Sequence, residues 1–199
     1  MEAFRHRQLM DRHQLAAALD DLAARLRTRL PREGVTVLPI LGGAMIFAAD
    51  LVRRLPSGLV MDFIRVQTYG DATSPQTAPV VDWRPKEANV RGRHVLLLDD
   101  ILDTGRTIQE AKRFLLEEMG AGQVTVAVLI DKPVRRAVDV QPDEAAVTFE
   151  EDHFFVGFGL DYRGLYRNLP DLLALETGED GLPIPAQKPA AEIEIAEGS

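Results

Sequence analysis

Two runs of apolar residues limit most strongly what this chain can fold into. Residues 95–98 are all valine or leucine, and residues 124–130 are apolar except for Thr125. A strand that covers only one face of a sheet alternates apolar and polar residues, whereas a strand buried on both faces is apolar throughout. Both runs therefore predict central strands of a mostly parallel sheet that helices cover on its two faces.

The rest of the chain alternates between strand and helix patterns, as such a sheet requires. Leucine recurs at helical spacing over residues 11–30, and Pro31 follows as a stop signal. Further helices are predicted over residues 44–55 and 108–119. Besides the two apolar runs, strands are predicted over residues 35–41, 59–69, 80–83 and 154–160. This order predicts one α/β domain over residues 1–176.

The composition argues against several kinds of function. The chain has 199 residues, which suits one domain, and it has no cysteine, so disulfides and thiolate metal sites are excluded. The apolar stretch at residues 35–41 is too short to cross a membrane, and the N-terminus lacks the apolar core of a signal peptide. The net charge of −8, without a long basic run, argues against nucleic-acid binding. We expect a cytoplasmic protein in which residues 177–199 form a flexible acidic tail.

A group of acidic and hydroxyl side chains follows the first apolar run. Asp99 and Asp100 come at the predicted end of that strand, and residues 103–107, Asp-Thr-Gly-Arg-Thr, make the turn into the next helix. In an open α/β sheet, ligands bind where the carboxyl ends of the strands lead into helices. Gly105 allows a positive φ, the first N–H groups of a helix favour an anion, and the two threonines add hydroxyl donors. The turn therefore suits a phosphate monoester.

Helix capping is a simpler role for Asp103 and Thr104. Capping does not explain two more carboxylates at the same strand end, where they repel each other. The paired acids suggest sugar hydroxyls or a metal ion as their ligand. The segment is neither a Walker loop nor a dinucleotide-binding fingerprint, because it lacks both glycine patterns.

Residues 95–107 as a whole, VLLLDDILDTGRT, resemble the phosphoribosyl pyrophosphate (PRPP) motif of the type I phosphoribosyltransferases. That motif has four apolar residues, two acids, two spacer residues, and then Asp or Ala followed by T-G-x-T. The resemblance implies an α/β fold with a mostly parallel central sheet flanked by helices and a small hood built from chain-terminal segments. It implies that Asp99 and Asp100 hold the ribose hydroxyls and Mg²⁺. The residues implied to hold the 5′-phosphate are Thr104, Gly105, Arg106 and Thr107.

Asp103 narrows the substrate within that family. Members that act on adenine or uracil typically have alanine at this position, whereas 6-oxopurine members have an aspartate that acts as general base toward purine N7. Residues 129–136, LIDKPVRR, look like the family's L-x-D-K-P-x-R-R, which implies that Lys132 donates to the purine 6-oxygen. The implied reaction transfers the 5-phosphoribosyl group from PRPP to hypoxanthine or guanine, giving IMP or GMP and pyrophosphate.

Residues 154–162, FFVGFGLDY, are similar to the family's F-V-V-G-Y-G-L-D-Y. The resemblance implies that Phe154 stacks on the purine and that the backbone of Phe155 reads its edge. Asp161, in the same purine-binding stretch, is implied to help hold Mg²⁺ on the pyrophosphate.

Five further residues complete the implied PRPP site. Arg167 matches an arginine that contacts pyrophosphate, and Thr68 and Tyr69 match the Ser-Tyr start of a mobile lid. Leu41 and Gly42 follow the first predicted strand, where the family has its pyrophosphate loop. The family usually has Leu-Lys-Gly there, so Leu41 replaces a lysine and removes a cation from the loop.

Two rival functions stay open at this stage. One is a transferase that prefers xanthine, and the other is a regulatory protein that binds PRPP without turnover. The basic face expected of a nucleic-acid-binding regulator is not visible in the sequence. The resemblance implies PRPP and a 6-oxopurine base as ligands, a homodimer or homotetramer, and no membrane partner.

Overall fold

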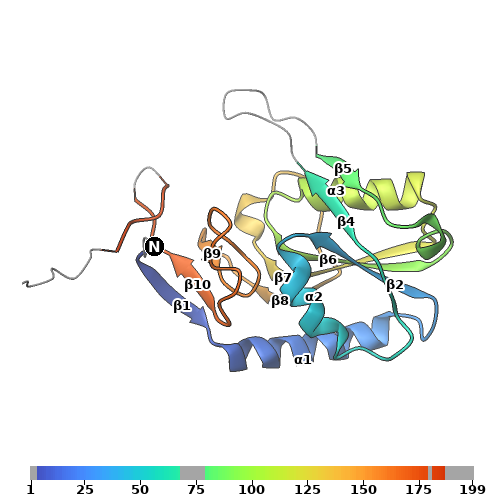
Figure 1. The fold of residues 1–199 in the computed structure, drawn as a ribbon, viewed down its shortest axis with the longest axis horizontal. Helices are drawn as coiled ribbons and strands as arrows, with labels where there is room; N and C mark the ends of the chain where they lie inside the picture. The colour runs from blue at the N-terminus through green and yellow to red at the C-terminus, as the bar shows by residue number, and fades with distance from the viewer. Residues whose placement is uncertain (1–3, 68–78, 179–180, 187–199) are drawn as a thin grey trace, which may run out of the picture.

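A seven-stranded sheet forms the centre of the molecule (Figure 1). The structure, a computed structural model, describes residues 4–67, 79–178 and 181–186. The strands of this sheet are β2 (Val35–Leu41), β3 (Val60–Met61), β4 (Ile64–Gln67), β5 (Val80–Trp83), β6 (His94–Leu102), β7 (Gln123–Asp131) and β8 (Glu144–Thr148). They pair in the order β5-β4-β2-β6-β7-β8, and β3 pairs with β2. The β4–β5 pair is antiparallel and the others are parallel, as the sequence predicts for most of the sheet.

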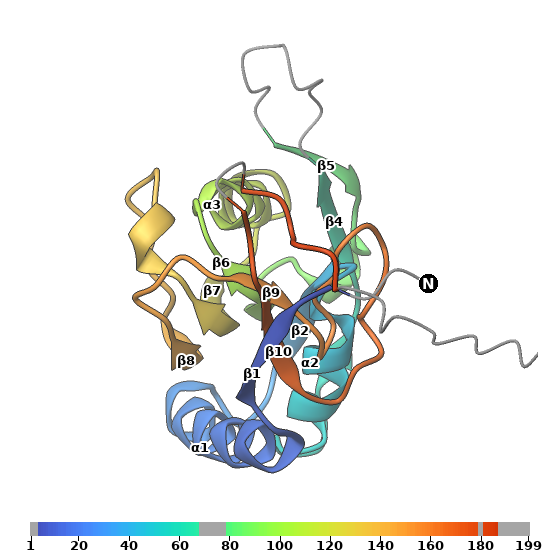
Figure 2. The same ribbon diagram turned by 90° about the vertical axis from the view of Figure 1, so that its left-hand side faces the viewer.

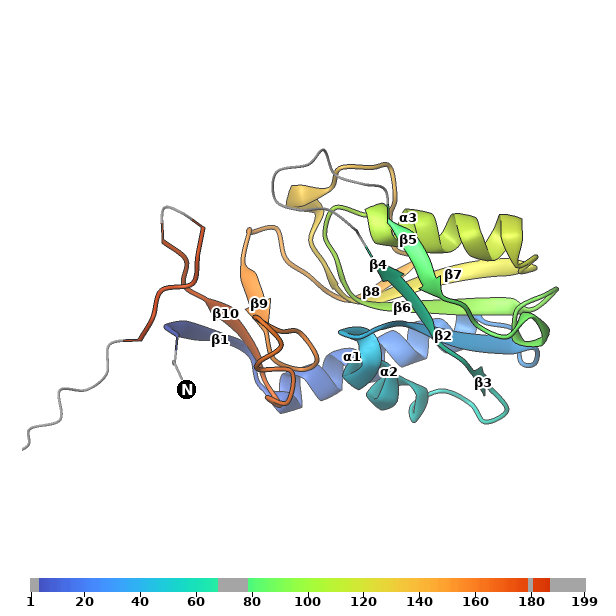
Figure 3. The same cartoon turned by 45° about the horizontal axis from the view of Figure 1, so that its top comes forward.

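Helices cover both faces of the sheet, α1 and α2 on one and α3 on the other (Figure 3). The helices are α1 (Arg12–Arg29), α2 (Ala44–Val52), α3 (Arg106–Arg113), its π-helical continuation η2 (Phe114–Glu118), and the short 3-10 helices η1 (Glu87–Asn89) and η3 (Pro133–Arg135). Each of the three helices predicted from the sequence is present.

The apolar run in β6 is buried on both faces, which confirms the prediction made from its composition. Val95 and Leu97 pack with α3, whereas Leu96 and Leu98 pack with α1 and α2, and all four are fully buried. Burying a side chain of this size stabilises the fold by roughly 1.5–3 kcal/mol. The central strand that carries the acidic motif is therefore held from both sides.

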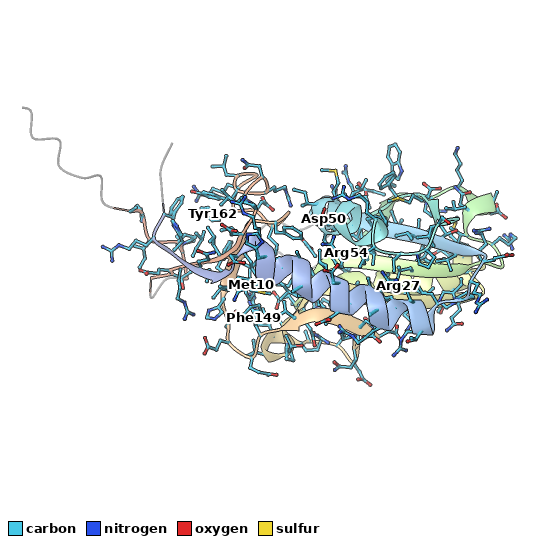
Figure 4. The ribbon with its side chains drawn as sticks, turned by 90° about the horizontal axis from the view of Figure 1, so that it is seen from below. Met10, Arg27, Asp50, Arg54, Phe149 and Tyr162 are labelled. Carbon is cyan, nitrogen blue, oxygen red and sulfur yellow. The ribbon has the colours of Figure 1, made fainter. Side chains whose placement is uncertain are left out.

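A second, three-stranded sheet forms the hood (Figure 2), and it is made from both ends of the described chain. Its strands are β1 (His6–Met10), β10 (Leu172–Leu175) and β9 (Phe154–Val156), antiparallel in that order. Met10 and Phe149 lie near the beginning of α1 (Figure 4), and both pack against the core that α1 shares with Phe155 of the hood. This sheet is the hood that the sequence predicts.

Asp11 connects the hood to the main domain, because it ends β1 and caps α1. Its carboxylate accepts hydrogen bonds from the N–H groups of His13 and Gln14, each at 2.8 Å, and the Gln14 side chain accepts the Asp11 N–H at 2.9 Å. This reciprocal capping box fixes where the helix begins. The Arg12 N–H donates to the Asp171 carboxylate at 2.9 Å, which links the same turn to the residue that precedes β10.

Two strand predictions were wrong in extent. The strand predicted over residues 59–69 is divided into β3 and β4, because the Asp62 carboxylate accepts the N–H of Phe63 and the side chain of Asn89, both at 2.8 Å. The strand predicted over residues 154–160 stops at Val156 and belongs to the hood instead of the parallel sheet. Gly157 and Gly159 end it with positive φ angles of 91° and 106°.

The described part of the predicted acidic tail lies beside the N-terminal segment. The Arg5 N–H donates to the Ile184 carbonyl at 2.9 Å, and the Glu176 N–H donates to the Arg5 carbonyl at 3.0 Å. A flexible tail from residue 177 stays a prediction, because residues 179–180 and 187–199 lie outside the described residues. Among the helices of the described chain, none has the length and apolar character needed to cross a membrane.

Candidate active site

A pocket of about 250 Å³ lies between two turns, one after β2 and one after β6. We call it the turn pocket. Its lining includes residues 40–43, residues 99–105, Thr107 and Ile108. The carboxyl ends of β2 and β6 lead into these turns, which is the position where ligands bind to sheets of this kind. Residues 99–105 of the predicted PRPP motif therefore lie around the same cavity as Leu41 and Gly42.

The sequence predicts that the strand ends at Asp99 and Asp100, but both residues lie inside β6, which continues to Leu102. The pairing of β6 with β7 continues through Asp99 opposite Val128 to Leu102 opposite Asp131. Charged residues within a central strand are unusual, so the length of the strand was not visible from the apolar run alone. The extra strand residues carry both carboxylates to the floor of the turn pocket.

The turn after β2 fits closely around Asp100. A Cβ atom added to Gly43 would lie 1.5 Å from Asp100 Oδ2, so no other residue can occupy this position without moving that carboxylate. A Cβ atom added to Gly159 would lie 2.4 Å from the Gly43 carbonyl oxygen, which shows how closely the hood approaches the same turn. Three segments distant in sequence thus meet at Gly43.

Burial and mutual repulsion oppose the ionisation of the two carboxyl groups. Burial raises the pKa of Asp99 well above its usual value, and the neighbouring Asp100 charge raises it further. Burial also raises the pKa of Asp100, against the opposing effects of its hydrogen bonds and of the Arg167 charge. A ligand that supplies hydrogen-bond donors or positive charge would stabilise both carboxylates. Ribose hydroxyls and a divalent cation are ligands of this kind.

The turn after β6 is shaped by Gly105, which precedes α3 with a φ of +86°. A Cβ atom at this position would lie 2.9 Å from a Val138 methyl group and 3.0 Å from Cδ of Arg136. The first N–H groups of any helix lack intrahelical acceptors and favour an anion. Of the residues predicted to hold the phosphate, Thr104, Gly105 and Thr107 line the turn pocket, whereas Arg106 does not.

The Arg136 side chain hydrogen-bonds to the main chain of this turn, a role that the sequence did not indicate. Its Nε donates to the Asp103 carbonyl at 3.0 Å, and its Nη2 donates to the Leu102 carbonyl at 3.2 Å and to Asp131 Oδ1 at 2.5 Å. The Thr104 carbonyl accepts the Ala137 N–H at 3.0 Å. The carbonyl groups of the turn therefore bond to the segment that follows β7. The quoted LIDKPVRR motif contained this arginine, but a motif does not show which backbone atoms it meets.

A second pocket, of about 220 Å³, lies between the carboxyl end of β6 and the hood, and we call it the hood pocket. It is lined by Asp100, Ile101, Asp103, Lys132, Arg135, His153, Phe154, Phe155, Leu160 and Asp161. All the residues predicted to bind the purine lie in this pocket, namely Lys132, Phe154, Phe155 and Asp161. Asp100, Ile101 and Asp103 line both pockets, so Asp103 stands where the two meet.

Asp103 has one carboxylate oxygen that the described protein leaves unsatisfied. Its Oδ1 is buried, and no hydrogen bond from a described residue reaches it. Its Oδ2 lies 3.6 Å from an Arg135 guanidinium nitrogen. Buried polar atoms nearly always have a hydrogen-bond partner, so an exception requires an explanation. A proton-bearing ligand atom between the two pockets would supply the missing partner.

Asp161 and Arg167, predicted to have separate roles, are paired with each other. An Arg167 guanidinium nitrogen lies 2.6 Å from Asp161 Oδ1, and the Gly164 N–H donates to Asp161 Oδ2 at 2.6 Å. Arg167 also donates to the Gly159 carbonyl at 2.6 Å. Arg167 does not line the turn pocket but a groove on the hood, although its charge reaches Asp100. The pair joins the hood loop to the edge of the site.

The remaining predicted positions are Leu41, Thr68 and Tyr69. Leu41 ends β2 and lines the turn pocket, and its peptide bond to Gly42 is cis. Its partner in register on β4 is Arg65, whose guanidinium lies 2.7 Å from the Asp82 carboxylate. Thr68 and Tyr69 lie outside the described residues.

The carboxylates fit a magnesium ion that arrives with its substrate. The described residues contain no group of three or more acidic, histidine or cysteine side chains that could enclose a metal ion. Mg²⁺ usually keeps several waters and binds one or two carboxylates together with substrate phosphates. Asp99 and Asp100 provide such a pair in the turn pocket.

Comparison with known proteins gives one consistent result. Residues 6–163 match the family described as phosphoribosyl transferase domain. The chain is 34% identical over 163 residues to a hypoxanthine-guanine phosphoribosyltransferase of Streptococcus pneumoniae, covering 81% of this chain and 88% of that protein. It is 41% identical over 136 residues to the enzyme of the same name from Lactococcus lactis, covering 67% of this chain and 71% of that protein.

Solved structures agree with these sequence matches. A crystal structure of a hypoxanthine-guanine phosphoribosyltransferase from Bacillus anthracis, with a HEPES molecule in its active site, superposes with a TM-score of 0.80. The two chains are 28% identical, and the match covers 87% of this chain and 100% of the other. A hypoxanthine phosphoribosyltransferase from Staphylococcus aureus superposes with a TM-score of 0.78 at 29% identity, covering 85% and 91% of the two chains.

Proposed function

Because the chain belongs to the phosphoribosyltransferase family, we propose that the turn pocket and the hood pocket are the two halves of its active site. The protein is a hypoxanthine-guanine phosphoribosyltransferase of purine salvage. It transfers the 5-phosphoribosyl group from PRPP to hypoxanthine or guanine, and the products are IMP or GMP and pyrophosphate. In our proposal the turn pocket takes PRPP and the hood pocket takes the base.

The observation that carries this assignment is the unsatisfied Oδ1 of Asp103 at the junction of the two pockets. In the reaction the bond between ribose C1′ and pyrophosphate breaks, and a bond forms between C1′ and purine N9. The purine loses a proton from its imidazole ring. Asp103 would accept this proton through N7, and general base catalysis of this kind contributes typically about 10²–10⁴-fold.

The turn pocket would hold the sugar, the 5′-phosphate and the pyrophosphate of PRPP. Asp99 and Asp100 would accept hydrogen bonds from the ribose hydroxyls, which stabilise the ionised forms that burial disfavours. The backbone of residues 104–107 and its threonine hydroxyls would bind the 5′-phosphate. The backbone at Leu41 and Gly42 would bind pyrophosphate without the usual lysine.

Two further parts of the site would act on the leaving group. Mg²⁺ neutralises the charge of pyrophosphate when it is bound, and Asp99 and Asp100 would be its protein ligands. Arg167 would have to exchange its contact with Asp161 for pyrophosphate, and Asp161 would then be free to support the metal. Thr68 and Tyr69 would begin a lid that excludes water from the cation-like transition state.

The hood pocket would select the base. Phe154 is 37% exposed, and its ring is nearly perpendicular to that of Tyr162 at a centroid distance of 5.4 Å. Its exposed part would stack on the base. Lys132 would donate to the purine 6-oxygen, and the backbone of Phe155 would read the edge of the ring.

We also propose, as the sequence predicts, a cytoplasmic location and a homodimer or homotetramer. Size-exclusion chromatography with light scattering would measure the oligomeric state.

A panel of bases tests the proposed function. Hypoxanthine, guanine, xanthine, adenine and uracil are each supplied with PRPP and magnesium, and pyrophosphate release is followed. We expect turnover with hypoxanthine and guanine and at most weak activity with the other three. A preference for xanthine would favour the rival transferase. The absence of turnover with every base, together with PRPP binding, would favour a regulatory protein.

A further inference from the structure

Lys132 brings a positive charge into the hood pocket with almost no contact with solvent. Its side chain is only 4% exposed, and its backbone N–H donates to the Leu102 carbonyl at 3.0 Å. The residue therefore follows β7 directly, close to Asp103. A buried ammonium group is unfavourable unless it is paired with an opposite charge and hydrogen-bonded.

The loop before β9 supplies both partners of this ammonium group. Asp152 Oδ1 lies 2.5 Å from Lys132 Nζ, and the His153 carbonyl oxygen accepts a hydrogen bond from the same nitrogen at 3.0 Å. The Asp152 side chain is 57% exposed, so it reaches Lys132 from the solvent side of the pocket. The hydrogen bond from Lys132 lowers the pKa of Asp152, as expected for a carboxylate that stays charged beside its partner.

An ammonium group has three N–H donors and no acceptor. Among the described residues, Asp152 and His153 take two of the three donors of Lys132. The third remains for a ligand in the pocket that Asp103 and Phe154 also line. A 6-oxo group can accept from this donor, whereas a 6-amino group is itself a donor and would oppose it.

We propose that Asp152 is a positioning residue that sets the selectivity of the enzyme for 6-oxopurines over 6-aminopurines through Lys132. This inference rests on the proposed function, and it assigns a role to a residue that does not itself touch the base. The Asp152 carboxylate pairs with the Lys132 ammonium group and accepts one of its N–H donors, and the His153 carbonyl accepts another. Together they direct the remaining N–H toward the position of the 6-oxygen.

A purely structural role for Asp152 makes a different prediction. If the ion pair only held the loop against β7, its loss would lower stability and weaken all ligands of the pocket alike. A positioning role changes the ratio between ligands that differ at the 6-position. IMP and AMP differ at the 6-position and in the proton at N1, which Lys132 is not assigned to contact, and their binding can be measured without turnover.

The test compares the wild-type protein with Asp152→Ala and Asp152→Asn. Calorimetry gives the dissociation constants of IMP and AMP, and steady-state kinetics gives the KM values of hypoxanthine and PRPP. In Asp152→Ala we expect IMP binding to weaken and the hypoxanthine KM to rise about tenfold, the loss typical of one hydrogen bond to a charged group. AMP affinity and the PRPP KM should stay within about twofold, because neither depends on the 6-oxygen. Asp152→Asn keeps an acceptor oxygen without its charge, so its effect should be about threefold.

Glu150→Ala is the matched control. Glu150 is an exposed acid in the same loop, and its replacement removes the same charge without removing either partner of Lys132. The ratio of IMP to AMP affinity should remain at the wild-type value. Thermal unfolding of all the variants shows whether each is folded.

An unchanged ratio of IMP to AMP affinity in folded Asp152→Ala would overturn the positioning role, and so would equal weakening of both nucleotides. If Asp152→Ala does not fold, Asp152→Asn carries the same test because it keeps the size of the side chain. Failure of the wild-type enzyme to turn over hypoxanthine or guanine would overturn the proposed function instead. The nucleotide affinities would still decide the role of Asp152 in that case.

Discussion

The two pockets that meet at Asp103 are built in different ways. The turn pocket is shaped by close main-chain packing, since Gly43 leaves no space for a side chain beside Asp100 and the carbonyls at the end of β6 bond to the segment after β7. The hood pocket consists of side chains from distant segments, with Lys132 at the end of β7 and Phe154 at the start of β9.

This difference predicts different roles for the two pockets. A turn that packs this closely has little freedom, so most substitutions of its glycines disturb its geometry. A pocket made of side chains can change its ligand when one side chain changes. We therefore expect the turn pocket to act on PRPP alike for every base, and the hood pocket to distinguish the bases. Asp103 belongs to both pockets and should have the largest effect of all.

Asp103→Asn tests the role of Asp103 as general base where the two pockets meet. The amide keeps the shape of the side chain but cannot accept the purine proton, so kcat should fall by about 10²–10⁴-fold. PRPP binding, measured by calorimetry, should survive because the phosphate turn is intact. Turnover equal to that of the wild type would remove Asp103 from the role of general base.

Gly43→Ala tests the turn pocket. Its Cβ would come within 1.5 Å of Asp100 Oδ2, so the carboxylate must move. A displacement of about 1 Å in an active site can reduce the rate by roughly 10²-fold, and we expect a loss of this size in kcat/KM for PRPP. The loss should be the same with hypoxanthine and with guanine.

Gly42→Ala serves as the comparison for that variant. A Cβ atom at Gly42 would have no neighbour within 4 Å, so the loss should be much smaller, although the backbone there is assigned to pyrophosphate. A change in the preference between hypoxanthine and guanine in Gly43→Ala would contradict the division of roles between the two pockets. Selectivity should change in Asp152→Ala instead.

Leu41→Lys tests the missing cation and should have the smallest effect. A lysine at this half-buried position could approach pyrophosphate, and a partly exposed charge pair contributes up to about 1 kcal/mol. The KM for PRPP should therefore fall by up to about fivefold, with the KM for hypoxanthine unchanged. Leu41→Met provides a long side chain without charge and should leave both KM values at their original level. An equal effect of methionine and lysine would show that charge is not the cause.

Much of the fold was predictable because its signals are local. The apolar runs in β6 and β7, the leucine spacing of α1 and the turn residues from Asp103 to Thr107 each lie within a short stretch of sequence. The resemblance to a known motif placed Asp99, Asp100 and Asp103 together in one segment, and the structure has them around one cavity. The extent of β3 and β4 was not predictable, because the break depends on the contact of Asp62 with Asn89.

The long-range contacts that complete the site could not be predicted from local sequence. Arg136 meets the carbonyls of Leu102 and Asp103 across more than thirty positions of sequence, at separations of 34 and 33 residues, and Asp152 reaches Lys132 only because the hood lies over the end of β7. Such pairs depend on how strands and hood pack, and packing brings together residues that share no local pattern. Local sequence was thus sufficient for the helices α1, α2 and α3, the apolar central strands and the turn after β6. The three-dimensional arrangement set the partners of each charged side chain, since a buried charge takes its partner from whichever segment the fold places beside it.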